Sequence, residues 1–488
     1  MGNAYVVGAM ALALTSLYYL LSGNNKKKDK LNYLTPQSAF FYMIDATLTN
    51  HVNAMLILDG NRSKKEFVDQ IRKKTRSYLQ FRSRLRTSWF GWPYYEEIKD
   101  DNILDTYLTH HELDETLDLT RIRLLLEEEI NTPMDPRKQL YKFTLYNFND
   151  GKSVMLFRMH HCILDGMSSA DILLHICEVD EKSLGELKKK SAEEQFLNKQ
   201  GSFKGFNLIT NSFGFIWSFL RIASMRAEGE HSLRASSNAY GNQRYKYSSI
   251  KETIPLSKIK DVCKRHTTEQ LKITINDVVM SSLSGALRRY ILKNGSEREK
   301  NKLENGEPYL VRNMTAVNTR NIKNVAQYII DNKTSFDESK LVVNMGNLFH
   351  ELPLHIQDPL ARLKQVAHIT KSRNYAGEVM VTKTSAILMP YMPLPGPLYR
   401  WVYSGMVDKV SVVTSNVRGP PCLLTFLGMP LERIAFNVPP FYRLGLIVGV
   451  YTYNNQLDMG MGTYQDLIAD PNQVTQYFYE EVNKLIQT

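Results

Sequence analysis

The sequence has few cysteines and lacks the motifs of several common kinds of site. Its 488 residues include only Cys162, Cys177, Cys263 and Cys422, which lie far apart and form no Cys-x-x-Cys pair. So few scattered cysteines argue against a disulfide scaffold and fit a reducing compartment. The chain also has no zinc-ligand spacing, no nucleic-acid-binding motif and no repeat of solenoid period. We therefore predict neither a metal site nor a nucleic-acid partner.

The length and composition are those of a large globular protein with an affinity for anionic partners. The chain is 43% hydrophobic, enough to bury a sizeable core, and its length favours two or more domains. Its formal net charge of +11 suits phospholipid surfaces or a phosphate-bearing substrate.

The amino terminus contains one uncharged apolar stretch, from Ala4 to Ser22. Its length is close to the ~20 residues that cross a bilayer as a helix, so we predict a transmembrane anchor within residues 1–30. The basic flank Lys26, Lys27, Lys28 and Lys30 places the rest of the chain in the cytosol. The alternative is a cleaved signal peptide, but in a signal peptide the basic residues precede the apolar stretch. Myristoylation at Gly2 is not favoured either, because Val6 stands where that signal has Ser or Thr.

After the anchor, strand-like and helix-like stretches alternate, which predicts an α/β fold built of two similar halves. "HVNAMLILDG" (residues 51–60) resembles a strand, and "SKKEFVDQIRKKTRSYL" a helix. Residues 31–180 form the first predicted half, 181–245 a connecting segment that begins with a charged stretch, and 246–488 the second half. Within the connection, residues 206–222 are apolar and aromatic. They indicate a packed crossover helix or, alternatively, a segment in contact with a membrane surface.

An unusual polar cluster occurs in "FRMHHCILDGMSS", between an apolar run and a helical pattern. The run "SVMLFRM" predicts a buried strand, and Ser168 or Ser169 would cap the helix that follows. His160 and His161 therefore lie in a strand-to-helix turn, where neighbouring side chains point to opposite faces. One histidine can face a cleft and the other the core, which argues against joint binding of one metal ion.

The chemistry of this cluster is compatible with two roles, a structural turn and an acid-base centre. A neutral imidazole can act as a base if a carboxylate orients it or anchors its loop. Asp165 is placed for that task, by pairing with an arginine elsewhere, and Gly166 leaves room for a close approach. A lone histidine would be structural, but the whole cluster favours catalysis. Cys162 is the competing nucleophile, although its side chain should point away from His161.

The cluster matches the His-His-x-x-x-Asp-Gly motif, and on it the chain resembles the coenzyme A-dependent acyltransferase superfamily. From "LTPQSAFFYMID" to the carboxyl end it is similar to the wax ester synthase/diacylglycerol acyltransferase branch. Three later landmarks follow in the family's order: "TINDVVMSSLSGALRRYI", "NMGNLFHELPLHIQDPLARLKQV" and "VVTSNVRGP". One departure precedes the histidines, where Gln139, Leu140 and Tyr141 stand in place of Pro-Leu-Trp and put the shape of the substrate pocket in question.

The resemblance implies two chloramphenicol-acetyltransferase-like subdomains around a central channel, in addition to the amino-terminal transmembrane helix. It implies acyl transfer from acyl-CoA to a long-chain alcohol, giving a wax ester, and to diacylglycerol, giving triacylglycerol. His161 would be the general base, with His160 and Asp165 in support and Gly166 making space for the pantetheine arm. Acyl-CoA would be a co-substrate, with no permanently bound cofactor and no covalent enzyme intermediate.

Two further landmarks supply second-rank site residues. Asn276 and Asp277 would contact substrate or the transition state, and so would Ser415 and Asn416. The alternative for Asp277 is a capping box with Thr274, and for Ser415 and Asn416 a plain turn.

The expected location is a membrane, at the endoplasmic reticulum, with one span and a cytosolic catalytic part. Lipophilic substrates that partition into a bilayer fit such an anchor. A non-catalytic, membrane-tethered lipid-binding or scaffolding protein on the same fold is the alternative function, and the complete histidine motif argues against it.

Overall fold

The structure is a computed structural model. It describes residues 31–45, 50–89, 91–179, 182–189, 208–236, 239, 244–248, 252–320, 330–331, 341–372, 375–392 and 394–488. The predicted anchor within residues 1–30 lies outside these ranges. Among the helices that they contain, none is long and apolar enough to cross a bilayer.

Within the described residues, the first sheet has seven strands, which run in the order β5, β6, β7, β2, β15, β14 and β8. Their bounds are β5 (Leu108–Leu113), β6 (Tyr141–Phe148), β7 (Lys152–His160), β2 (His51–Asp59), β15 (Met429–Asn437), β14 (Leu424–Phe426) and β8 (Glu178–Val179). Alternate residues of β2 enter two different cores, Leu56 on one face and Ile57 on the other. Helices α3 (Lys64–Thr75) and α6 (Gly166–Ile176) contribute to the first core, and α5 (Leu119–Ile130) to the second. Because both faces are covered, nearly every residue of the central strands β2 and β7 is buried.

The second sheet follows the order β10, β17, β16, β13, β11 and β12, and β9 (Tyr245–Tyr247) also pairs with β17. The bounds are β10 (Ile254–Pro255), β17 (Gln456–Tyr464), β16 (Leu446–Tyr453), β13 (Val412–Arg418), β11 (Arg312–Asn318) and β12 (Met345–Glu351). Strand β13 lies parallel to both β11 and β16. In the described part of the chain, one face is covered by the helices α9 (Leu256–His266), α10 (Ile275–Asn294), α11 (Glu297–Glu304), α13 (Pro359–Ser372) and α16 (Pro471–Gln487).

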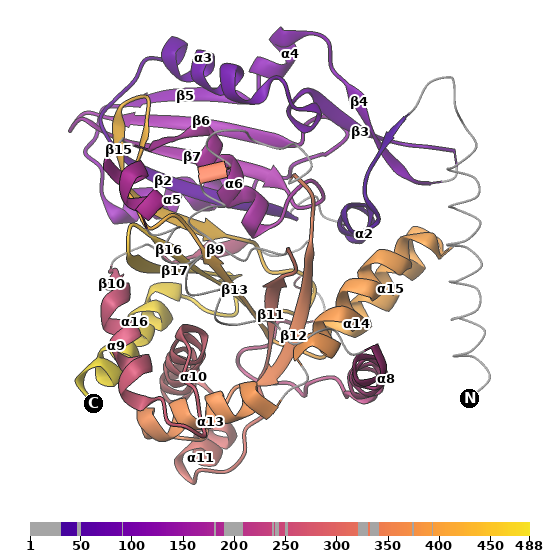
Figure 1. Ribbon diagram of the computed structural model, residues 1–488, viewed down its shortest axis with the longest axis vertical. Coiled ribbons are helices and arrows are strands. Elements are labelled where there is room, and N and C mark those ends of the chain that lie inside the picture. The colour runs from indigo at the N-terminus through magenta and orange to yellow at the C-terminus, as the bar shows by residue number, and fades with distance from the viewer. Residues whose placement is uncertain are drawn as a thin grey trace.

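A third group of helices packs beside both sheets. It consists of α2 (Pro36–Ile44), α8 (Leu208–Ser224), α14 (Tyr375–Leu388), the short helix η3 (Met389–Tyr391) and α15 (Gly396–Val407), which share one apolar cluster. Figure 1 shows α2, α8, α14 and α15 together on one side of the molecule, the right in this view. The small sheet of β1 (Asn32–Tyr33), β4 (Pro93–Glu97) and β3 (Ser83–Thr87) lies above them.

The second half of the chain contributes a hairpin to the first sheet. Strands β14 and β15 come from the second half of the sequence, yet β15 pairs along β2 in the first sheet and the chain then returns to β16 in the second. Two strands of the predicted second half, residues 246–488, thus belong to the first sheet. The α/β character and the two sheets agree with the predicted fold.

Individual elements agree with the sequence pattern in most places. The predicted strand at 51–60 is β2, and the predicted helix after Ser63 is α3, which begins with a capping box between Ser63 and Glu66. The predicted capping box between Thr274 and Asp277 opens α10.

Candidate active site

The histidine cluster joins the end of β7 to the start of α6. Strand β7 ends at His160, and α6 begins at Gly166 with Asp165 as its N-cap. The Asp165 Oδ1 atom accepts a hydrogen bond of 2.9 Å from the Ser168 backbone N–H. The prediction that Ser168 or Ser169 caps this helix was therefore wrong, since both lie inside its first turn.

The two histidines point to different sides, as extended geometry predicted. His160 is fully buried, and its Nδ1 atom accepts the Cys162 backbone N–H at 3.2 Å. The proton of its ring therefore sits on Nε2, which lies 3.2 Å from Asp45 Oδ2 and donates to it. His161 is half-buried and lines a cavity. This arrangement leaves His161 as the histidine that can meet a substrate.

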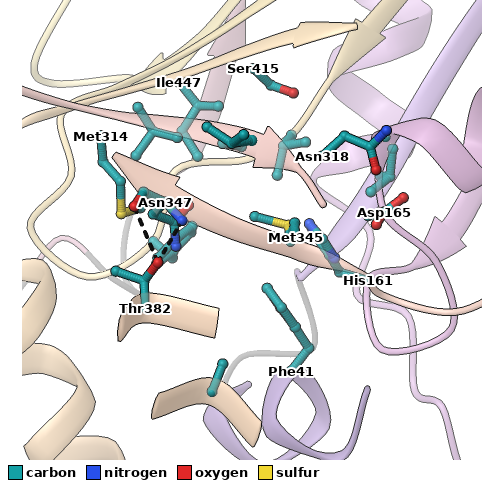
Figure 2. Close-up of a pocket in the computed structure, with 18 of the residues that line it drawn as sticks. Phe41, His161, Asp165, Met314, Asn318, Met345, Asn347, Thr382, Ser415 and Ile447 are labelled. Carbon is teal, nitrogen blue, oxygen red and sulfur yellow. Dashed lines mark hydrogen bonds between the residues drawn. The ribbon is translucent and has the colours of Figure 1, made fainter. Parts of the chain in front are cut away.

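The cavity lies between the two halves and has a volume of about 170 Å³. Its walls come from α2, the histidine turn, strands β11, β12, β13 and β16, and the helices α14, η3 and α15. Most lining side chains are apolar, among them Met314, Phe349, Tyr403 and Ile447. Figure 2 shows His161 with Asp165 and Asn318 to one side of it and Met314 and Ile447 to the other. The cavity thus offers an apolar chamber beside a polar corner.

The plane of the His161 ring is fixed by its neighbours. The Phe41 ring of α2 stacks on it, with ring centroids 4.3 Å apart and an angle of 5° between the planes. The His161 backbone N–H donates to the Asn50 carbonyl at 2.8 Å, and the Asn50 side-chain amide donates to the Phe41 carbonyl at 3.2 Å. Asn50 therefore ties the helix that carries Phe41 to the histidine turn.

Burial lowers the pKa of His161 below its ordinary value of 6.5. Asp165 and the backbone carbonyls of His161 and Leu164 act in the opposite direction, and His160 adds to the lowering. Because the net shift is downward, the ring is neutral near pH 7, which is the form that can accept a proton.

Asp165 anchors the turn through charge as well as through its cap. Its Oδ2 atom accepts hydrogen bonds from Arg320 Nη1 at 2.9 Å and from the Asn344 backbone N–H at 2.8 Å. Both side chains of the Asp165–Arg320 ion pair are largely buried. The predicted arginine partner is thus Arg320, which lies just beyond β11 and links the histidine turn to the second half.

Gly166 lies where α6 meets β13. A Cβ atom at this position would lie 2.9 Å from Cγ2 of Val417 and 3.7 Å from the Ser415 hydroxyl. The absence of a side chain therefore lets β13 approach the histidine turn, and Gly166 itself lines the cavity.

Ser415 and Asn416 reach the same cavity from β13. Among the described residues, no hydrogen bond joins either side chain to a protein group. Both are therefore available to a bound substrate. A plain turn, the alternative for these two positions, does not occur, since both lie within a strand.

The structure does not bring Asn276 and Asp277 to this cavity. Both lie in the first turn of α10, outside the cavity lining, and Asp277 accepts hydrogen bonds from the backbone N–H and the hydroxyl of Thr274 at 2.8 and 2.7 Å. Capping, the predicted alternative, accounts for Asp277 without any contact to substrate.

Two other positions that the sequence singled out also lie elsewhere. Leu140 and Tyr141 are buried, and the Leu140 carbonyl accepts the His160 backbone N–H at 2.9 Å, so this departure from Pro-Leu-Trp supports β7 and does not line the cavity. Cys162 is buried in the core of the first half, also outside the cavity lining.

Four residues that hold the site were not predicted as site residues: Phe41, Asp45, Asn50 and Arg320. Phe41 and Asp45 belong to "LTPQSAFFYMID", which carried the resemblance but no assigned role. Arg320 is separated from Asp165 by 155 residues, so no local pattern connects the two. Within the described ranges, no group of three His, Cys, Asp or Glu side chains is arranged to hold a metal ion.

Comparison with known proteins identifies similar sequences along most of the chain. Residues 34–279 match the family model described as the wax ester synthase/diacylglycerol acyltransferase catalytic domain, and residues 344–486 match the WS/DGAT C-terminal domain. The "Probable diacyglycerol O-acyltransferase tgs1" of Mycobacterium tuberculosis is 22% identical over 93% of this chain and 96% of its own length. The "O-acyltransferase WSD" of Acinetobacter baylyi is 22% identical over 78% of this chain and 80% of its own.

A solved structure has the same fold. The wax ester synthase/diacylglycerol acyltransferase from Marinobacter aquaeolei VT8 superimposes with a TM-score of 0.61 at 17% sequence identity. The match covers 93% of this chain and 98% of that one. The shared fold therefore extends over both halves.

Proposed function

Because the chain belongs to the wax ester synthase/diacylglycerol acyltransferase family, and is therefore an acyl-CoA-dependent O-acyltransferase, we propose that it transfers fatty acyl groups to a long-chain alcohol, with His161 as the general base. One observation carries the proposal: a neutral histidine, held between an aromatic ring and an anchored turn, faces an apolar cavity.

The proposed reaction needs no acyl-enzyme. His161 removes the proton of the acceptor hydroxyl while the oxygen attacks the thioester carbonyl of acyl-CoA. The collapse of the tetrahedral intermediate breaks the carbon–sulfur bond, and the thiolate takes the proton from His161. Ser415 and Asn416 can donate hydrogen bonds to the carbonyl oxygen as it gains negative charge. The products are an ester and free coenzyme A.

The lining of the cavity supports a lipophilic acceptor. Each methylene group that enters such an apolar chamber contributes roughly 0.8 kcal/mol, so longer alcohols should bind better until the chamber is full. A single-chain alcohol also needs less width than diacylglycerol, which carries two acyl chains. We therefore propose a long-chain primary alcohol as the preferred acceptor and diacylglycerol as the second.

A competition assay tests the activity and the acceptor together. Purified protein receives one labelled acyl-CoA with equal amounts of a long-chain alcohol and diacylglycerol, and both esters are quantified. We expect more wax ester than triacylglycerol, and no ester from His161→Ala protein that keeps its circular dichroism spectrum. Preference for diacylglycerol would reverse the acceptor assignment alone, whereas full turnover by His161→Ala would refute the role of the base.

The order of events has a separate readout. Acyl-CoA alone should release no stoichiometric burst of coenzyme A, and Cys162→Ala should remain active, because Cys162 is buried away from the cavity. A burst that is lost in Cys162→Ala would favour an acyl-cysteine intermediate.

We also propose that residues 4–22 attach the enzyme to a membrane, at the endoplasmic reticulum, with the catalytic part in the cytosol. The apolar length of this segment and its lysine flank support this proposal.

A further inference from the structure

Helix α8 turns an apolar face toward solvent. Its exposed apolar side chains are Ile216, Trp217, Phe219 and Leu220. Ser218 and Ile222, on the opposite side, are buried. At about 100° per residue, the exposed apolar side chains cover roughly 160° of the helix circumference. The outward face of a helix on a globular protein is normally polar, so this face lacks the partner that its composition requires.

Apolar side chains are also exposed on the neighbouring elements. Leu398 and Trp401 are exposed on the same side of α15, Met380 is exposed on α14, and Met392 directly follows η3. An ion pair of 2.5 Å between Arg221 and Glu378 joins α8 to α14. Figure 1 shows the three helices on one side of the molecule. We call this set the outer apolar surface: Ile216, Trp217, Phe219, Leu220, Met380, Met392, Leu398 and Trp401.

Two of these helices, α14 and α15, form one wall of the cavity together with η3. Thr382 and Ala386 of α14, Met389 of η3 and Tyr403 of α15 point inward and line the chamber that His161 faces. α14 and α15 therefore carry residues of the cavity wall as well as residues of the outer apolar surface, whereas α8 packs against α14 and contributes no residue to the cavity lining. This arrangement favours a partner in which apolar substrates also dissolve.

Cations border the outer apolar surface. Arg226 lies two residues after the end of α8 and is exposed, and Arg400 precedes Trp401. Neither forms an ion pair with a carboxylate among the described residues. Lys409 donates to the Ile222 carbonyl at 2.6 Å, so a third cation lies at the carboxyl end of α8. The neighbouring carboxylate of Glu378 is buried and paired with Arg221. Apolar side chains with tryptophan, bordered by arginine and lysine, match the interface of an anionic bilayer.

We propose that the outer apolar surface docks onto the surface of an anionic lipid bilayer, in addition to any attachment through residues 1–30. Trp217 and Trp401, 68% and 71% exposed, enter the interfacial region of the lipid, and Arg226 and Arg400 contact the headgroups. The docking places the helical wall of the cavity against the phase in which lipophilic substrates dissolve. It depends on lipid contact and not on acyl transfer, so it can be tested on inactive His161→Ala protein.

The first experiment measures the binding of the full chain to sedimented vesicles of phosphatidylcholine with phosphatidylglycerol. In Trp217→Asp/Trp401→Asp protein we expect the partition coefficient to fall roughly tenfold or more, because two interfacial anchors become charged. The matched control is Ile103→Asp/Leu124→Asp, at apolar positions 46% and 44% exposed on α4 (Asp101–Asp105) and α5. The control should bind like the unchanged chain. Equal losses in both variants would contradict the proposal.

The second experiment reports contact even if residues 1–30 alone hold the protein on the vesicle. Lipids brominated in their acyl chains quench nearby tryptophan, and Trp89 and Trp92 provide internal references. We expect strong quenching in the unchanged chain, and much weaker quenching in Trp217→Phe/Trp401→Phe protein. If the bound chain shows equal quenching with and without these two tryptophans, the outer apolar surface does not touch lipid. If their emission in lipid-free protein is already shielded from aqueous acrylamide, residues 1–30 or a second copy cover the surface, and the proposal is also refuted.

Discussion

His161 combines a lowered pKa with a fixed ring plane. The pKa follows from burial and the ring plane from the stacked Phe41 ring, while the hydrogen bond from the His161 backbone N–H to the Asn50 carbonyl holds the turn. His160, its neighbour, is held in the core by Asp45 and the Cys162 backbone. Two identical side chains thus obtain different roles from their contacts.

The lowered pKa of His161 predicts the acid limb of the pH–rate profile. A histidine whose pKa lies below 6.5 stays neutral as the pH falls through 6.5, and it loses its basic form only below the lowered value. We expect kcat/KM for ester formation to decline with an acid-side pKa below 6.5. Circular dichroism at each pH is the control, because burial also lowers the pKa of His51, and its protonation destabilises the fold in acid. A decline at or above 6.5 in folded protein would contradict the assignment.

Phe41 is expected to act as a positioning residue. Phe41→Leu removes a stacking contact that is typically worth ~1 kcal/mol, so we expect kcat to fall by about fivefold to tenfold. Phe41→Tyr keeps the ring and should retain most of the activity. Phe436→Leu is the matched control, because Phe436 also lines the cavity but its ring packs on Tyr451. A change confined to KM would indicate that Phe41 serves only in substrate binding.

At the scale of elements, the site depends on how closely α6 approaches β13. Asp165 caps α6 and binds Arg320, while Gly166 brings the helix against Val417. The backbone of Gly166 does not have a positive φ, so the glycine serves close packing and not a special conformation.

Substitution of Gly166 tests this packing. The Cβ of Gly166→Ala would lie 2.9 Å from a branched side chain on a strand, so we expect a loss of about 1–3 kcal/mol in the free energy of unfolding, with reduced turnover. Gly405→Ala in α15, where nothing lies within 4 Å of the new Cβ, should be neutral or stabilising. Gly166→Ala/Val417→Ala should regain part of the loss. Equal stability of Gly166→Ala and the unchanged chain in denaturant titration would show that the helix can shift freely.

At the scale of the whole molecule, the β14–β15 hairpin couples the two halves of the chain. Strand β15 lies between β2 and β14 in the first sheet, and the chain continues directly into the second sheet. The Arg320–Asp165 ion pair and the contact of α2 with α14 and α15 add further links.

We therefore expect both halves to unfold together. Denaturant titrations followed by far-ultraviolet circular dichroism and by tryptophan fluorescence should coincide, since removal of β15 would open the first sheet. The control is the Trp217→Phe/Trp401→Phe protein, whose tryptophan fluorescence comes only from Trp89 and Trp92 in the first half. Two separate midpoints would show that each half is stable alone.

The sequence by itself determined the local elements and the chemistry of the motif. The strand and helix patterns, the cap at Thr274 and the opposed histidines depend on periodicity and on neighbours within a few residues, so the printed chain was sufficient for each. The resemblance, confirmed by the family match, extended this to the reaction class.

Only the tertiary structure decided which distant residues complete the site. Phe41, Asp45 and Arg320 act on the histidine turn across separations of 115 residues or more, and no local pattern encodes such pairs. For the same reason Asn276 and Asp277, placed at the site by resemblance, lie outside the cavity, and α8 shows its apolar side to solvent. Side-chain periodicity says which residues share a face, but the packing of the whole chain determines what that face meets.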